Sequence, residues 1–349
     1  MHDYSVAKLN TLSDTALKAL AWKQLTRFNA RLLELHGKGE LNNAHHAKLP
    51  LRPILCVNDI GLIDDTTIEA SFTFPDDAEQ WIFHHDESLE MLFQDQLDQL
   101  VGFWASRKAD GIGRALSSGA CQLYSPLKFV PGQLIKYKLT KRKWIKSKEA
   151  AGGTAVFNGQ ILDENDKPIL ETKNIIVGIL PPQDVKNLRK IHGGTSGVDI
   201  ASAPAPPASL TIPVYDSEIN LKTDTGNGET SATATQQINP HLWPFQFHFI
   251  GDPVLPGNFG THGIITLLKQ IARDRFDVHN PKFISLDKKN FSGMIFEDTK
   301  QIRFELVDIK KEENGCIVAA RGNLYLEHAD GKRMIDEPIY TFKNIRVGS

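Results

Sequence analysis

The sequence is poor in the features that mark several large classes of protein. Its 3 cysteines, Cys56, Cys121 and Cys316, are widely spaced and odd in number, which argues against a disulfide framework or a zinc site. No apolar run approaches the roughly 18 residues that cross a membrane, and the first residues lack the basic-then-apolar pattern of a secretory signal. These absences favour a protein of the reducing cytoplasm with no membrane span.

Charge of either sign is not in excess either. The chain has 40 lysine and arginine residues against 42 aspartate and glutamate residues, and its formal net charge is -2. This balance argues against a general nucleic-acid binder. The rest of the composition, 41% hydrophobic and 23% charged over 349 residues, is that of a globular protein with two or three domains. The sequence shows no glycine-rich nucleotide loop and no clustered metal ligands, so we expect neither a metal nor a cofactor.

An internal repeat determines the predicted architecture. Residues 173–178 (KNIIVG) recur as residues 343–348 (KNIRVG). Upstream, residues 158–162 (NGQIL) are echoed by residues 321–325 (RGNLY) at a similar offset. Two echoes in the same order predict that the chain contains two related halves.

Each half reads as an early strand, one long apolar helix and then three or four antiparallel strands. A single helix wrapped by a curved sheet is the hot-dog arrangement, so we expect an α+β double hot-dog in which the halves form a covalent pseudo-dimer. Pattern alone leaves other α+β folds open. The expected divisions are a helical extension at 1–48, a first half at 49–182, a Pro/Ala/Gly-rich linker at 183–213 and a second half at 214–349.

The most informative segment is residues 248–258 (HFIGDPVLPGN), where His248 stands beside a Pro/Gly turn. A buried helix is expected from Gly260, and amides near Gly257 and Asn258 should lack intrahelical acceptors. A histidine can take a proton and a helix N-terminus can hold an oxyanion, which suits proton removal next to a thioester carbonyl. Glycine at 257 would allow the carbonyl to approach closely. The alternative is a core histidine beside residues that only shape a turn.

The second candidate is Asp95, within a helical pattern that runs from Leu89 to Trp104. Gln99 lies one turn after Asp95, where its amide can hold the carboxyl group. Periodicity alone favours a different interpretation, a solvated polar row that Asp95 shares with Gln94, Gln96 and Asp98.

These motifs resemble the catalytic region of the bacterial β-hydroxydecanoyl thioester dehydratase/isomerase family. That family shows Asn-Pro-x-Leu-Trp, then His-Phe-Ile-Gly-Asp-Pro-Val-x-Pro-Gly and then a helix, as residues 239–263 do here. Its aspartate precedes Trp-Gln-Leu-Val-Gly-Phe, which Asp95 and residues 99–103 (QLVGF) match. The resemblance covers both halves from about residue 50, but not the N-terminal helix or the linker. The tandem arrangement is similar to the dehydratase didomain of bacterial polyunsaturated fatty acid synthases.

The resemblance implies a hot-dog dimer in which each site takes a histidine from one protomer and an aspartate from the other. His248 matches the histidine and Asp95 the aspartate, so we expect one working site made by opposite halves. At the second site, His262 stands in the position of the aspartate. The first half has His84 and His85 near the histidine position but lacks the oxyanion turn. That second site should be degenerate.

The resemblance also implies the reaction, which is dehydration of a 3-hydroxyacyl thioester to a trans-2-enoyl thioester without a cofactor. The Gly257 amide would bind the thioester oxygen and His248 would remove the α-proton. Asp95, protonated in an apolar tunnel, would give a proton to the departing hydroxyl. The backbone carbonyl of Val254 would orient His248, and Gln99 would orient Asp95. Some members of the family also isomerise the product.

An acyl carrier protein within a larger multidomain synthase is the expected partner. Such carriers are acidic, and the densest basic run of the chain supplies Lys141, Arg142, Lys143 and Lys146 for docking. The alternative for this run is a solvated strand and turn. Two rival functions also stay open. One is a hot-dog acyl thioesterase, which would use a carboxylate to activate water, and the other is a non-catalytic didomain that binds acyl chains or scaffolds an assembly.

Overall fold

The structure contains two groups of elements of the same kind. The computed structural model describes residues 57, 59–74, 89–106, 108, 112–127, 130–147, 152–180, 214–223, 230–239, 242, 244–245, 254–297, 299–313, 315–328 and 337–349. Within these residues, the first group consists of β1 (Asp59–Ile63), β2 (Thr67–Thr73), α4 (Leu89–Ser106), β3 (Ile112–Ser118), β4 (Cys121–Leu123), β5 (Leu134–Lys146), β6 (Gly153–Leu162) and β7 (Pro168–Leu180). The second consists of β8 (Asn220–Thr223), β9 (Thr230–Gln237), α7 (Gly257–Phe276), β10 (Lys282–Leu286), β11 (Lys288–Phe291), β12 (Thr299–Lys311), β13 (Ile317–His328) and β14 (Tyr340–Gly348).

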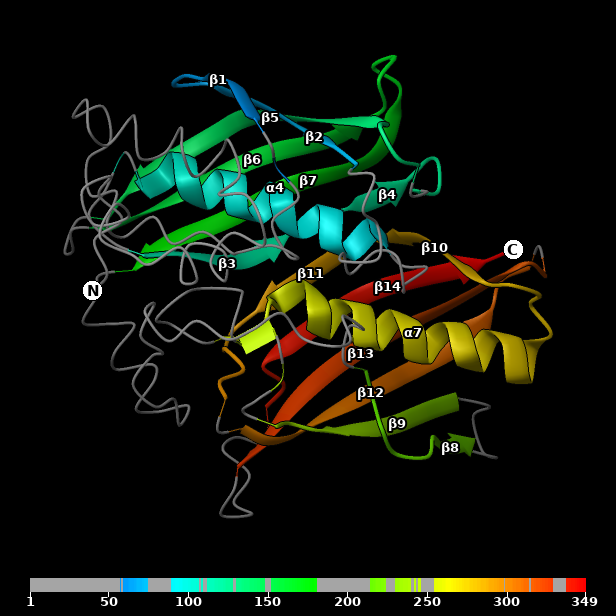
Figure 1. The fold of residues 1–349 in the computed structure, drawn as a ribbon. Helices are drawn as coiled ribbons and strands as arrows, with labels where there is room; N and C mark the ends of the chain where they lie inside the picture. Colours follow the sequence, from blue (N-terminus) through cyan, green and yellow to red (C-terminus); the bar gives the residue numbers. More distant parts are fainter. Residues whose placement is uncertain are drawn as a thin grey trace, which may run out of the picture.

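Each group is an antiparallel sheet curved around one long helix (Figure 1). In the first, apolar side chains at helical spacing turn α4 toward β6 and β7, and Phe93, Leu97 and Trp104 are fully buried there. In the second, α7 packs on β12, β13 and β14 in the same way. A helix enclosed by one curved sheet is a hot-dog fold, so the expected double hot-dog is confirmed.

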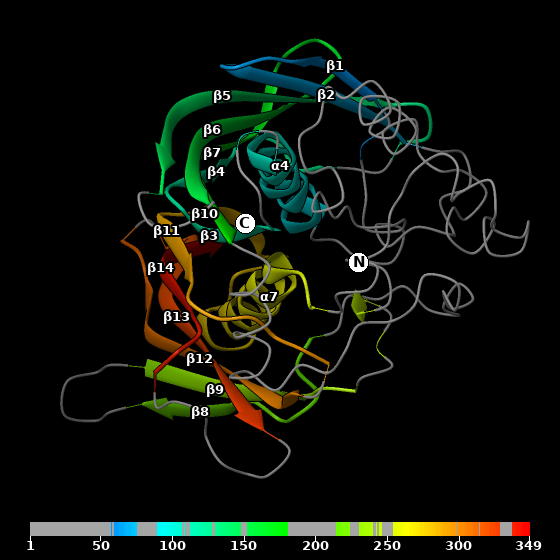
Figure 2. The same cartoon turned by 90° about the vertical axis from the view of Figure 1, so that its left-hand side faces the viewer.

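Two short strands from each half join the sheets into one. β3 pairs with β11, and β4 pairs with β10, both antiparallel. Exchanging β3 for β10 and β4 for β11 leaves this pattern unchanged, so the halves are related by an approximate two-fold axis. The described strands therefore form a continuous 14-stranded sheet that curves around both helices, with α4 and α7 packed together inside it (Figure 2). We call the β3/β4–β10/β11 junction the seam.

The repeat that the sequence predicted is visible as a matched irregularity in the sheet. Asn174 and Asn344, one in each copy of the repeat, both adopt left-handed backbone conformations, with φ of 49° and 52°. Asparagine tolerates this conformation better than most residues. The β6–β7 pairing shifts register beside Asn174, and the β13–β14 pairing shifts beside Asn344. Equal bulges at equal places align the two halves residue by residue.

Glycines in the second repeated motif allow each helix to approach its sheet. A side-chain Cβ at Gly159 would lie 3.0 Å from Leu97 Cδ1 of α4, and one at Gly322 would lie 2.8 Å from Ile264 Cγ1 of α7. Leu97 and Ile264 therefore occupy equivalent positions. The same spacing makes His262 equivalent to Asp95.

The start of α7 and the surroundings of the polar row on α4 differ from expectation. α7 begins at Gly257, three residues before the expected start, because burial of Asn258 and Phe259 outweighs the low helix propensity of this segment. The polar row on α4 is buried and not solvated. The expected extension at 1–48 and linker at 183–213 lie outside the described residues. None of the helices in the described ranges combines the length and apolar character needed to cross a bilayer.

Candidate active site

Asp95 lies on α4 where the first half meets the start of α7 in the second half. Its side chain is buried, with 3% of the residue exposed. Asn258 Nδ2 donates a hydrogen bond to Asp95 Oδ1 at 2.9 Å, and Gln99 Nε2 donates to Oδ2 at 3.3 Å. The structure thus brings together Asp95 and Gln99 of the first half and Asn258 of the second.

The surroundings of Asp95 favour its protonated form. Burial raises the pKa of this carboxyl group, while hydrogen bonds from Asn258 and Gln99 and the charge of Lys289 oppose the rise. Burial raises the pKa of Tyr340 as well, and the negative charge of a nearby Asp95 adds to that effect. A carboxyl group that keeps its proton can act as a general acid.

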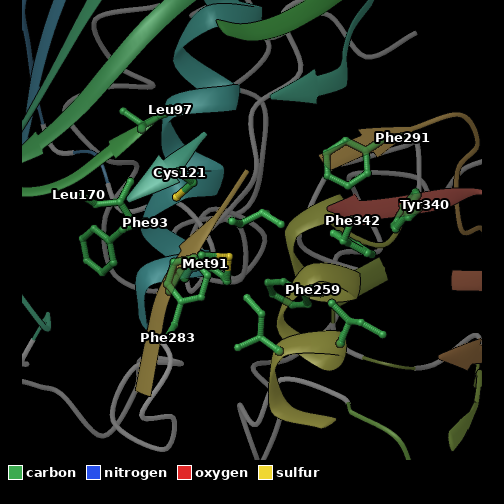
Figure 3. Packing of buried hydrophobic residues seen from close by; sticks show 14 of the residues in the cluster. Met91, Phe93, Leu97, Cys121, Leu170, Phe259, Phe283, Phe291, Tyr340 and Phe342 are labelled. Atoms are coloured by element: carbon green, nitrogen blue, oxygen red, sulfur yellow. The ribbon is translucent and has the colours of Figure 1, made fainter. Parts of the chain in front are cut away.

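Buried apolar side chains from both halves surround α4 and α7, the helices that carry Asp95 and Asn258 (Figure 3). Met91 and Phe93 are buried on α4, and Phe259 is buried on α7. Phe291 and Tyr340 stack edge to face with their ring centroids 4.7 Å apart. Such an environment has a low effective dielectric, which strengthens electrostatic effects on a reacting group.

The N-terminus of α7 has no side-chain cap. Its N-cap is Pro256, which has no polar side chain and makes no capping hydrogen bond. The first amides of a helix have no intrahelical acceptor, and the helix dipole adds partial positive charge there. A Cβ on Gly257 would lie 3.3 Å from the ring of Phe291, so glycine also relieves crowding at this point. These amides can stabilise an oxyanion.

The half that contains α7 matches a known family model. Residues 215–335 match the family model described as the FabA-like domain. This part of the chain is therefore similar to FabA-like domains, and we call residues 214–349 the FabA-like half. The matched segment includes α7 and the HFIGDPVLPG motif, whereas Asp95 lies outside it, in the half that packs against it.

Solved structures with similar folds include enzymes of two kinds. The dehydratase domain from the CurJ module of curacin polyketide synthase is 9% identical, with a TM-score of 0.47 over 84% of this chain and 95% of that chain. A conserved hypothetical protein from Mycobacterium tuberculosis, described as having a double hotdog fold, is 13% identical, with a TM-score of 0.43 over 75% and 81%. An acyl-ACP thioesterase from Bacteroides thetaiotaomicron is 13% identical, with a TM-score of 0.42 over 80% and 97%.

Sequence reasoning missed two charged residues beside Asp95. Asp98 of α4 and Lys289 of β11 are both buried, with Lys289 Nζ 3.7 Å from Asp98 Oδ2. Asn258 Nδ2 donates to Asp98 Oδ2 at 3.0 Å, and Lys289 Nζ donates to Asn258 Oδ1. Strand alternation places Lys289 on the same face as buried Phe291, a signal that could have revealed it. Asp98 gave no such signal, because its partners lie in the FabA-like half.

The other predicted residues fall into two groups. His248, His84 and His85 lie outside the described residues. Val254 is buried and forms an isolated bridge with Phe296. His262 is buried on α7, and its Nε2 lies 3.4 Å from Thr266 Oγ1, an arrangement that mirrors Asp95 with Gln99.

The basic run lies on the C-terminal part of β5. Lys141 is half-buried, with its Nζ 5.3 Å from the centre of the Trp104 ring. Arg142, Lys143 and Lys146 are exposed. Three of the four cations are therefore accessible to a partner.

Proposed function

We propose that the chain dehydrates 3-hydroxyacyl thioesters, presented by an acyl carrier protein, to trans-2-enoyl thioesters in fatty acid synthesis. One observation carries the proposal: Asp95 of the first half, whose pKa is raised by burial, is hydrogen-bonded to Asn258 in the first turn of α7, in the FabA-like half. Acid and oxyanion donors thus meet at one place. The tandem halves support a role as a module of a polyunsaturated fatty acid synthase.

The bond changes can be written with the residues of this chain. The α-proton of the substrate passes to His248, and its electron pair forms the Cα–Cβ double bond. The Cβ–O bond breaks, and the leaving hydroxyl takes the Asp95 proton to become water. The His248 imidazolium and the Asp95 carboxylate then return to their starting forms by proton exchange with solvent.

The start of α7 supplies the electrostatic part of the mechanism. Removing the α-proton shifts negative charge to the thioester oxygen, and imidazole alone is too weak a base to do this unaided. The Gly257 amide, with the helix dipole behind it, stabilises that charge. Gln99 holds the Asp95 carboxyl group in place. The carbonyl of Val254 orients His248 in this scheme.

Turnover of carrier-bound 3-hydroxyacyl thioesters of several chain lengths tests the proposal. Enoyl formation and free thiol release are followed together in the wild type, His248→Ala, Asp95→Asn and the control His262→Gln. We expect the first two variants to lose about 100-fold or more in kcat, the range for loss of an acid or base, and the control to stay active.

Other outcomes would replace the proposal with a rival function. Release of free thiol without enoyl product would indicate a thioesterase. Acyl binding by a wild type that turns over neither way would indicate a scaffold. Activity that survives Asp95→Asn but not His262→Gln would show that the active site is the two-fold related one that contains His262.

A further inference from the structure

A polar network crosses the seam next to Asp95. It contains Asp95 and Asp98 of the first half and Asn258 and Lys289 of the second, and all four are at most 7% exposed. The network has two carboxyl groups and one ammonium group. Burying an unpaired charge is costly, so a single ionised carboxylate is the arrangement that balances the ammonium.

The contacts decide which carboxyl group is ionised. Lys289 Nζ lies 3.7 Å from Asp98 Oδ2, and burial of Asp98 raises its pKa while Lys289 is the strongest opposing influence. Asp95 receives its hydrogen bonds from the neutral amides of Asn258 and Gln99. The charge therefore belongs on Asp98, and an ionised Asp98 disfavours ionisation of its neighbour.

Lys289 also fixes the orientation of the Asn258 amide. An ammonium group has donors only, so the Asn258 oxygen must face Lys289 and its NH₂ group must face the two carboxyl groups. One N–H then goes to Asp95 Oδ1 and the other to Asp98 Oδ2. Among the described residues, Asp95 Oδ2 has only the longer 3.3 Å contact with Gln99, so this oxygen is left to carry the proton.

The opposite side of the approximate two-fold axis lacks these charges. Ile265 occupies on α7 the position that Asp98 occupies on α4. Cys121 pairs with Thr172 as Lys289 pairs with Phe342, so Cys121 is the counterpart of Lys289. A buried ion pair contributes little to stability on average, and the fold holds the equivalent positions without one. The pair accompanies Asp95 alone.

We propose that Asp98 and Lys289 are positioning residues for Asp95: Lys289 holds the negative charge on Asp98 and turns the Asn258 amide, so that Asp95 keeps its proton on Oδ2. The inference rests on the proposed function insofar as Asp95 is the acid of the reaction.

The other ionisable groups near the network stay neutral or lie beyond the pair. Burial raises the pKa of Cys121 to about 11 and raises that of Tyr340 on β14. Glu90, also on α4, acts on the Cys121 thiol, as Asp98 and Lys289 do. Within the described residues, Lys289 is thus the charge that opposes the rise in the pKa of Asp95, and it opposes the rise at Asp98 as well.

The test compares Asp98→Asn with the double variant Asp98→Asn/Lys289→Met in the full chain. Asparagine keeps the shape of Asp98 but removes its negative charge. Asp95 is then the remaining carboxyl group of the network that can balance the Lys289 ammonium. The pKa of Asp95 should then fall by about 1 unit or more, which moves the alkaline limb of the kcat profile down equally and lowers kcat about tenfold above that limb. Removing both charges should return the limb toward the wild-type position. Lys288→Met, an exposed neighbour on β11, is the matched control.

Carboxyl ¹³C NMR of labelled aspartate, with Asp95→Asn for assignment, reads the same change without turnover. If the Asp95 resonance titrates unchanged in Asp98→Asn, the inference is wrong and the pair is structural. If the alkaline limb of the double variant stays where it lies in Asp98→Asn, the inference is also wrong. A wild type without dehydratase activity that still shows the NMR shift and its rescue would overturn the proposed function but support the charge placement.

Discussion

At Asp95, burial is the largest of several influences on the chemistry of one side chain. Its hydrogen-bond partners are amides, which hold the carboxyl group in place without supplying a full charge. Desolvation is therefore the largest influence, and it raises the pKa of Asp95. The same burial should make the ionised form of Asp95 destabilise the fold at higher pH.

Asp95→Asn should stabilise the folded chain progressively as the pH rises from 4 to 7. The folded protein binds this proton more tightly than the unfolded chain, so the stability linked to it falls as pH rises from the unfolded value toward the raised pKa. The asparagine variant escapes this loss, which amounts at most to on the order of 1.4 kcal/mol per pH unit. Thermal unfolding across pH measures it, with the exposed Asp274→Asn as control. A Tm difference between variant and wild type that does not grow with pH would contradict the expectation.

Residue-scale predictions succeeded where the partners are local in sequence. The Asp95–Gln99 contact follows from helical spacing, and the structure contains it. The solvated row was wrong because periodicity on one helix cannot reveal what covers its polar side, and here the other half does. Lys289 was overlooked because a lysine in a short strand ordinarily faces solvent.

At the scale of the element, close approach of helix and sheet depends on a glycine in each half. Gly159 faces Leu97 and Ile175, and Gly322 faces Ile264 and Ile345. Since α4 carries Asp95 and α7 carries Asn258, the depth at which each helix sits helps to set the distance between them. The glycines therefore support the site from the far side of each helix.

Gly159→Ala should destabilise the chain by about 1–3 kcal/mol, because its Cβ would lie 2.9 Å from Ile175 Cδ1. Ile175→Val removes that atom and should itself cost about 0.5–1.5 kcal/mol. Denaturant unfolding of the double variant should show a smaller loss than the sum, by about 0.5 kcal/mol or more. Gly159→Ala with Ile345→Val, the equivalent change in the other half, should be additive. Additivity in both pairs would show that crowding against Ile175 does not cause the loss of stability in Gly159→Ala.

The start of α4 was predicted correctly and that of α7 was not, and the difference has a physical reason. α4 was expected from Leu89 because its apolar residues recur at helical spacing from the first turn. The opening of α7 has glycines and an asparagine in place of strong helix formers, so its first turn depends on contacts with the other half. Sequence patterns report local preference and cannot include those contacts. The seam pairings of β10 and β11 were beyond prediction for the same reason.

At the scale of the whole molecule, the densest basic run of the sequence lies on one strand of the first half, β5. Arg142, Lys143 and Lys146 are exposed on β5. We propose that this surface meets the acidic carrier.

Lys143→Glu/Lys146→Glu should raise KM for carrier-bound substrate about tenfold, while kcat and the KM for a pantetheine thioester stay near wild type. Charge reversal removes attraction during docking without touching the site. Steady-state kinetics at low and high salt measure this, and the effect should shrink at high salt. Lys300→Glu/Lys310→Glu, on the equivalent strand β12, is the control. An equal rise in KM for both substrates would exclude a docking role.

The seam of this chain joins non-identical surfaces, and that changes what substitution can achieve. In a dimer of identical subunits, any residue introduced on one side of the axis appears on the other side too. Here Lys289 faces Asp98 on one side, while Cys121 and Ile265 stand at the mirrored positions. Covalent linkage therefore frees each side from copying its two-fold related counterpart, so a charge can be placed beside Asp95 while the surroundings of His262 change independently.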